Sequence, residues 1–320
     1  MEIEHLEEAL QLAGWLLAEQ MDTVTRGEVP HPHVILSSEE LEWPKLVKIT
    51  TSSDSYEDLV SGGRDFFSDQ ASHARCRVFA YDADLDPAGR IVFLEVAWKG
   101  WSQPITFGQR YWPPTEEDDD FMLAGEVELL GRELLPSSVL EALESAQWRE
   151  LVDRGAEDHP VAGEQWLAWN ADRQAGPGCC SLKEFTFPVL PGWYPKPADF
   201  PGLMLFRLMP RSVGSIPAIA LVSLDMEEEL NAEGMAEHFK AKIAENDVDV
   251  ISSDIFHVAS LALTAGRILW VDSESGMNVV QVFIPRKDRS CFSLWATALP
   301  EFWADTLKGL DAVLASLQTR

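Results

Sequence analysis

Apolar residues recur at intervals of three and four near the start of the chain, a spacing that places them on one face of a helix. Further along, apolar runs on both sides of Asp86 indicate a β-hairpin, and another apolar run follows it as a third strand. The helices are expected over residues 2–21, 56–69, 136–149 and 163–170, and the strands within 74–100 and over 104–112. This half is therefore expected to be α+β, an antiparallel sheet with helices on one face.

A stretch rich in glycine and proline, NADRQAGPGCCS, interrupts both periodicities and predicts a linker over residues 171–181. It separates a domain of residues 1–170 from one of residues 182–320, also α+β and antiparallel. In the second domain, Asp225 is expected to cap a helix and Pro300 to open the last helix. The strands are expected over residues 184–188, 204–209, 218–224, 248–257, 260–264, 267–272, 278–284 and 292–298.

Charge restricts the classes of partner. The 320 residues carry a formal net charge of −28, and residues 1–180 hold 35 acidic and 13 basic residues, a net of −22. Such a surface repels nucleic acids and anionic membranes, so neither is expected as a partner. The chain starts without the pattern of a secretory signal, and no apolar run is long enough to insert in a membrane. We therefore expect a cytoplasmic protein.

Motifs for chemistry are missing from the sequence. It has no glycine-rich phosphate loop, no nucleophile elbow and no zinc-binding helix motif. His31 and His33 form a tempting pair, but the prolines beside them favour a loop and no further ligands can be named. Adjacent Cys179 and Cys180 are expected to be ordinary thiols, and the acidic run at residues 116–120 a solvated loop. We expect no enzyme activity, no metal and no cofactor.

A proline-flanked corner, FTFPVLPGWYPKP, opens the second domain with Trp193 after a Pro-Gly pair. The stretches PAIALVSLDMEEELNAEGMAEHF and LPEFWADTLKGLDAVLASL follow as strand–helix and terminal helix. In this order, residues 185–318 resemble the PsbP-like domains, which include DcrB-type proteins and the Eag chaperones of type VI secretion. The resemblance implies a non-catalytic scaffold that binds another protein; the clients of Eag chaperones are apolar transmembrane segments of secreted toxins. The acidic first domain resembles no family.

Three functions follow from these observations. The first is a cytoplasmic adaptor or chaperone that binds a protein client, such as an apolar segment of a secreted effector. The second is an immunity-like inhibitor whose acidic half blocks a basic toxin. An enzyme of unknown type is the third.

The partner-binding residues are expected at two places. The aromatic corner of Trp193 and Tyr194 either seals the edge of the sheet or grips the client. The apolar stripe of the terminal helix should cover one face of the sheet. Alternate residues Val280, Val282 and Ile284 are then expected to face away from that helix, where they would meet a client or a second copy in a homodimer.

Overall fold

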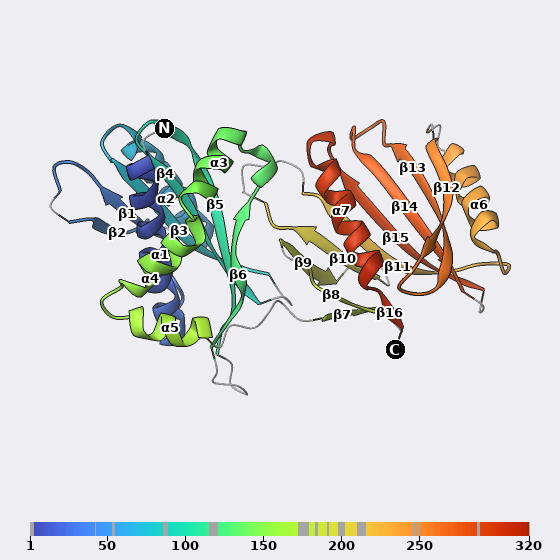
Figure 1. Cartoon of the computed structure of the whole chain (residues 1–320), viewed down its shortest axis with the longest axis horizontal. Helices are drawn as coiled ribbons and strands as arrows, with labels where there is room; N and C mark the ends of the chain where they lie inside the picture. Colours follow the sequence, from blue (N-terminus) through green and yellow to red (C-terminus); the bar gives the residue numbers. More distant parts are fainter. Residues whose placement is uncertain are drawn as a thin grey trace. The chain divides into compact units, whose positions relative to one another are not determined.

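The protein folds into two compact units, Met1–Gly176 (unit 1) and Pro177–Arg320 (unit 2), each with its own core (Figure 1). The division falls inside the stretch that the sequence marks as a linker. The structure, a computed structural model, describes residues 3–41, 43–52, 55–85, 89–114, 121–171, 179–182, 185–190, 192–197, 202–209, 216–245, 248, 250–286 and 289–319.

Unit 1 is a six-stranded antiparallel sheet in the order β2-β1-β3-β4-β5-β6. Its elements are α1 (Ile3–Thr25), β1 (His33–Ser37), β2 (Lys45–Lys48), α2 (Tyr56–Asp69), β3 (Cys76–Asp84), β4 (Arg90–Trp98), β5 (Trp101–Trp112), β6 (Met122–Leu130), α3 (Ser137–Ser145), α4 (Trp148–Glu157) and α5 (Gly163–Ala171), with short 3₁₀ turns at Gln70–Ser72 and Arg132–Leu134. Helices α1, α3, α4 and α5 share one core with one face of this sheet. Helix α2 packs on the other face, where Phe67 lies 6.3 Å from Phe79 between ring centroids. Helices thus cover both faces, not the single face expected.

The α-helices of unit 1 follow the predicted ranges closely, with one correction. The stretch over residues 136–149 is two helices, because Gln147 has a φ of 50° and the chain turns there from α3 into α4. Strands β1, β2 and β6 were not predicted from the sequence, since β1 is too short for a period-two signal and β2 is largely exposed.

Unit 2 is built on a seven-stranded antiparallel sheet in the order β12-β13-β14-β15-β11-β10-β9, beside a small sheet in the order β16-β8-β7. Its elements are β7 (Cys179–Leu182), β8 (Phe185–Pro188), β9 (Trp193–Pro197), β10 (Gly202–Arg207), β11 (Ala218–Asp225), α6 (Ala232–Ala244), β12 (Val250–Val258), β13 (Leu263–Val271), β14 (Asn278–Pro285), β15 (Ser290–Ala298), α7 (Pro300–Ser316) and β16 (Gln318–Thr319). In Figure 1, α7 and α6 lie on either side of β13–β15.

The two helices of unit 2 cover different parts of the seven-stranded sheet. Helix α7 places Leu310, Val313 and Leu314 in the main core, together with the small sheet, as its apolar stripe predicts. Helix α6 packs on β12, β13 and β14 from the opposite face, where Phe239 stacks on Phe283 with 4.1 Å between ring centroids. We call these the α7 face and the α6 face.

Two expectations about unit 2 need correction. Helix α6 begins at Ala232 rather than after Asp225, because the side chain of Asn231 accepts a hydrogen bond from the Gly234 amide at 2.8 Å and caps it. Residues 226–230 therefore form a connector outside the helix. The strands expected over 260–264 and 267–272 are the single strand β13. The proline-rich β9 lies at the edge of the sheet, where its missing amide donors cost least.

Some predictions fall outside the described residues: the hairpin turn at 86–88, the acidic run at 116–120, residues 172–178 of the linker, and the side chains of Cys179 and Cys180. Among the helices that are described, none combines the length and apolar character needed to cross a bilayer.

Candidate functional site

An apolar groove lies on the α6 face of unit 2, beside the part of the sheet that α6 covers. The strand register sets Met204, Ala220 and Trp295 side by side across β10, β11 and β15. A cavity of about 530 Å³ opens above them, and every described residue that lines it is uncharged. Its main lining residues are Met204, Ala218, Ala220, Val222, Leu224 and Trp295.

Trp295 is the largest side chain of the groove and is 39% exposed. Its indole N–H donates to Ser293 Oγ at 2.8 Å, and the Gln281 amide donates to the same oxygen at 3.0 Å. The polar atom of the tryptophan is therefore satisfied inside the sheet. What remains for contact is the apolar ring surface, the part of tryptophan that contributes most to protein interfaces.

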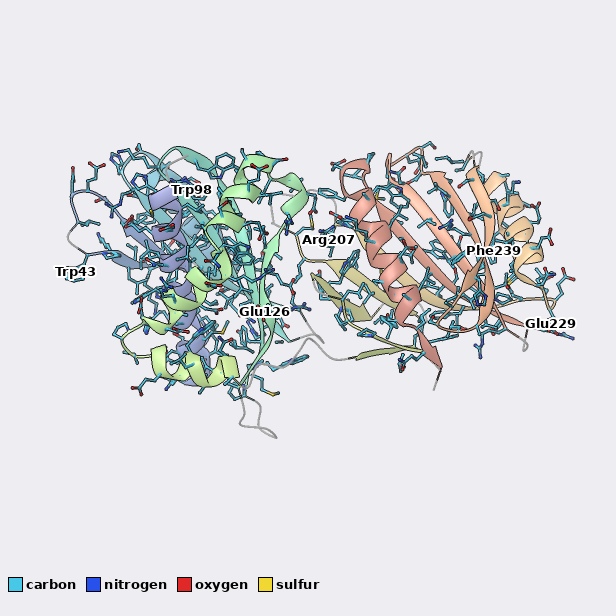
Figure 2. The ribbon with its side chains drawn as sticks, in the orientation of Figure 1. Trp43, Trp98, Glu126, Arg207, Glu229 and Phe239 are labelled. Carbon is cyan, nitrogen blue, oxygen red and sulfur yellow. The ribbon has the colours of Figure 1, made fainter. Side chains whose placement is uncertain are left out.

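Acidic residues stand at one end of the groove. Leu224 lines the groove, and the chain continues directly into Asp225 and the connector to α6. Met226 and Leu230 of this connector pack into the α6 cluster, so the connector rises on the same face as the groove. Asp225 and Glu227 through Glu229 are all exposed there, and Figure 2 shows Glu229 pointing outward.

The predicted partner-binding residues separate into two groups. Val280, Val282 and Ile284 are buried under α7, so the expectation that they face away from this helix is wrong. The alternation was recognised correctly, but it cannot say which of two apolar faces receives the helix. Trp193 is also buried: a Cβ added at Gly309 of α7 would lie 2.8 Å from its ring. Its side chain therefore packs into the core and is not exposed for contact with a client.

Tyr194 is the one predicted residue on the α6 face. The register pairs it with Phe206 on β10, 5.7 Å away between ring centroids, and burial raises the pKa of its phenol. It lies one strand beyond the groove and remains half-buried. Sequence reasoning missed Trp295, although the alternation of Leu294, Trp295 and Ala296 already set the tryptophan on the face opposite the other two.

A buried polar cluster in unit 1 is the main alternative site. Asp82 accepts a hydrogen bond from the Tyr111 hydroxyl at 2.8 Å and from Arg90 Nε at 2.9 Å, and it also forms an ion pair with Arg90. Burial raises the pKa of Asp82 and that of Tyr111. The three groups satisfy one another across β3, β4 and β5, which suits a structural role in the sheet.

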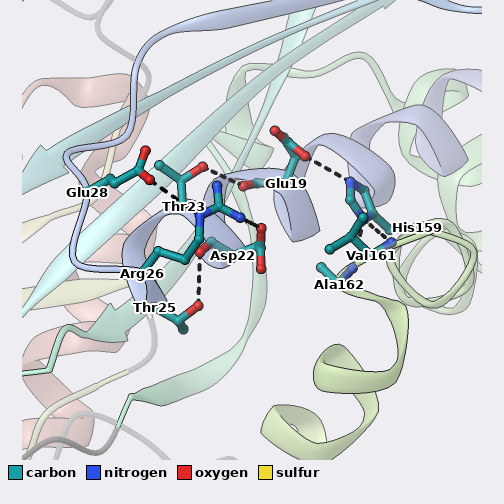
Figure 3. A network of polar contacts seen from close by, with 9 residues as sticks. All are labelled: Glu19, Asp22, Thr23, Thr25, Arg26, Glu28, His159, Val161 and Ala162. Atoms are coloured by element: carbon teal, nitrogen blue, oxygen red, sulfur yellow. Dashed lines mark hydrogen bonds and ion pairs between the residues drawn. The ribbon is translucent and has the colours of Figure 1, made fainter.

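A second polar contact joins α1 to the turn before α5 (Figure 3). His159 Nδ1 accepts from the amides of Val161 and Ala162 at 3.2 and 2.9 Å. The proton is therefore assigned to Nε2, which donates to Glu19 at 3.0 Å and lowers the pKa of that carboxyl.

The histidine pair of the sequence lies at the start of β1, beside Gln20 of α1. His33 Nδ1 lies 2.8 Å from both Gln20 Nε2 and the His31 carbonyl oxygen, and burial lowers the pKa of its imidazole. Over the described ranges, no three His, Cys, Asp or Glu side chains gather closely enough to hold a metal ion.

Comparison with known proteins shows similarity of fold only. No family model matches the sequence, and no curated protein matches it. The solved structure of PsbP from the cyanobacterium Synechocystis is 9% identical over 44% of this chain and 89% of its own, with a TM-score of 0.33. LpqN of Mycobacterium tuberculosis, involved in cell envelope biogenesis, is 13% identical over 42% and 83%, with a TM-score of 0.32.

A third structure aligns over both units. The immunity protein TplEi of the type VI secretion system of Pseudomonas aeruginosa is 10% identical over 90% of each chain, with a TM-score of 0.28. The predicted α+β architecture is confirmed by the structure itself, which has two large antiparallel sheets with helices packed on them. The part of the chain that the sequence likens to PsbP-like domains aligns with structures of that kind.

Proposed function

We propose that the chain is a non-catalytic, cytoplasmic adaptor or chaperone whose unit 2 holds an apolar segment of a protein client. The observation that supports it is the groove on the α6 face, an open apolar surface in the middle of a sheet. Among the described residues, its lining has no acidic, basic, histidine or cysteine side chain for acid–base or thiolate chemistry, and its hydroxyl groups are those of Ser223 and Thr297. What it offers is an exposed tryptophan ring. Apolar surface of this kind marks interaction sites in folded proteins.

The test is to identify the client and then to block the groove. The full chain is used to capture partners from its native cells, and each partner identified by mass spectrometry is purified and titrated. We expect Trp295→Ala to weaken binding by about thirtyfold, the effect of removing a tryptophan hot spot worth about 2 kcal/mol. Ala220→Glu, which puts a charge on the groove floor, should abolish binding.

Trp43→Ala is the matched control, because Trp43 lies in unit 1 between β1 and β2 and is 76% exposed (Figure 2). Thermal melting must show that each variant is folded. A client that binds Trp295→Ala and Ala220→Glu as tightly as the original chain would contradict the proposal.

Charge supports a second candidate function, an inhibitor that covers a basic protein. The observation that favours this function is the acidity of unit 1, which has 35 acidic and 13 basic residues. Electrostatic association predicts an on-rate that falls steeply as salt rises, whereas binding in an apolar groove should change little. Stopped-flow association with the purified client at about 0.05 and 0.5 M salt, on either side of the concentration at which the screening length is about 8 Å, separates the two functions.

A further inference from the structure

The groove has the width of one row of side chains. Ala220 lies between Met204 and Trp295, which belong to the two neighbouring strands. Because adjacent strands are about 4.8 Å apart, the two larger residues start about 10 Å from each other and extend upward as walls. Ala218 and Ala220 form a low floor along β11 between them.

A helix suits this floor better than an extended segment. Strand β11 is hydrogen-bonded to β10 on one side and to β15 on the other, so it offers no free edge for strand addition. An extended client lying on an apolar face would leave its own amide and carbonyl groups without partners, whereas a helix satisfies them internally. From Ala218 to Leu224 the floor runs about 20 Å, the length of about 13 helical residues.

The acidic connector favours an occupant that carries positive charge at this end of the groove. Asp225 and Glu227 through Glu229 stand where the groove ends at Leu224. These four carboxylates outnumber the two described arginines beside the connector, Arg286, which lines a pocket with Glu229, and Arg289, whose carbonyl accepts from the Met226 amide, so this end attracts positive charge. A helix contributes positive charge at its N-terminus through its dipole, and lysine or arginine side chains there add to it. A second copy of this chain, with a net charge of −28, would instead bring repulsion.

We propose that the groove binds an amphipathic helix of a client, an inference that rests on the proposed function. One row of apolar side chains of this helix would lie along β11, and basic residues in its first turn would lie beside Glu227–Glu229. Its apolar residues recur every three or four positions over about four turns.

The experiment uses the full chain and three dye-labelled peptides of 14 residues. All carry leucine at positions 3, 7, 10 and 14 in an alanine and glutamine background. The first peptide has lysine at positions 1 and 2, the second has lysine at positions 12 and 13, and the third has no lysine. Fluorescence anisotropy should show the peptide with N-terminal lysines binding about tenfold more tightly than the one without lysine, and more tightly than the one with lysines near its C-terminus.

Two variants with the same change in net charge isolate the connector. Glu227→Gln/Glu228→Gln/Glu229→Gln should remove the preference for N-terminal lysines. Glu57→Gln/Glu141→Gln/Glu164→Gln, which neutralises three exposed glutamates of unit 1, should keep it. Ala220→Glu should prevent binding of all three peptides, and thermal melting verifies that each variant is folded.

The other outcomes separate this inference from the proposed function. Equal binding of the three peptides, unaffected by the connector variant, overturns the charge assignment while the groove remains a binding site. If no peptide binds although a client still depends on Trp295, the helical occupant is wrong and the proposed function stands. If light scattering shows a dimer that Ala220→Glu dissociates, the occupant is a second copy of this chain.

Discussion

Substitution of Gly155 by alanine tests a close approach of two helices in unit 1, the crossing of α1 and α4. A Cβ added at Gly155 would lie 2.0 Å from the carbonyl oxygen of Gln11, about 1.4 Å short of the 3.4 Å at which ordinary contact begins. The obstacle is backbone, which cannot rotate away, so the two helices must separate. Gly14 makes the reciprocal approach, 1.8 Å from the Val152 carbonyl oxygen, so separation disturbs both sides of the crossing.

Two opposing contributions decide whether Gly155→Ala raises or lowers the free energy of unfolding. Alanine favours a helix over glycine by about 1 kcal/mol. Overpacking a close-packed core costs about 1–3 kcal/mol and more where backbone must move, and here the shift would open a core that contains Leu10, Ala13 and Leu17. We therefore expect Gly155→Ala to lower the free energy of unfolding of unit 1 by at least about 2 kcal/mol.

The matched control is Gly62→Ala in α2, where the one described atom that the added Cβ would contact is Thr51 Cγ2, at 3.4 Å. Without a steric cost, this change should stabilise unit 1 by about 0.5–1 kcal/mol. Urea unfolding followed by circular dichroism and tryptophan fluorescence measures both. A Gly155→Ala protein as stable as Gly62→Ala would refute the tight crossing.

Three further predictions concern single side chains. The hydrogen bond from His159 lowers the pKa of Glu19 below its ordinary value of 4.5. The stabilisation that Glu19 contributes is therefore present above pH 4.5 and is lost as the pH falls through the folded-state pKa. Over that range, the difference in melting temperature between the original chain and Glu19→Gln should shrink. Arg77 is buried with the Phe67 ring 4.8 Å from its guanidinium carbon and no ion pair to another described residue, so Arg77→Met should raise the melting temperature of unit 1 by about 2–8 °C; a decrease would mean that a counter-charge is lost. Leu310→Ala should destabilise unit 2 by about 2–5 kcal/mol in calorimetry without moving the transition of unit 1.

The candidate site shows where sequence reasoning succeeds and fails. The terminal helix was predicted with its stripe because Leu310, Val313 and Leu314 recur with the helical period, and all three are buried. The groove was missed, because its residues belong to three strands and include alanines, whose small size gives no signal in the sequence. Only the register that aligns Met204 with Ala220 and Trp295 makes them one surface.

By itself, the sequence determined the fold class, the acidity of the first half and the alternation along each strand, because these are properties of local order and composition. Tertiary structure decided which side of the sheet each helix covers. Asn231 caps α6 late, and the chain from Asp225 crosses to the side of Phe283 before the helix begins. As α6 then lies over β12–β14, the neighbouring strands keep an open apolar face. Such a choice depends on the path of a connector and on contacts far apart in sequence, which local periodicity does not encode.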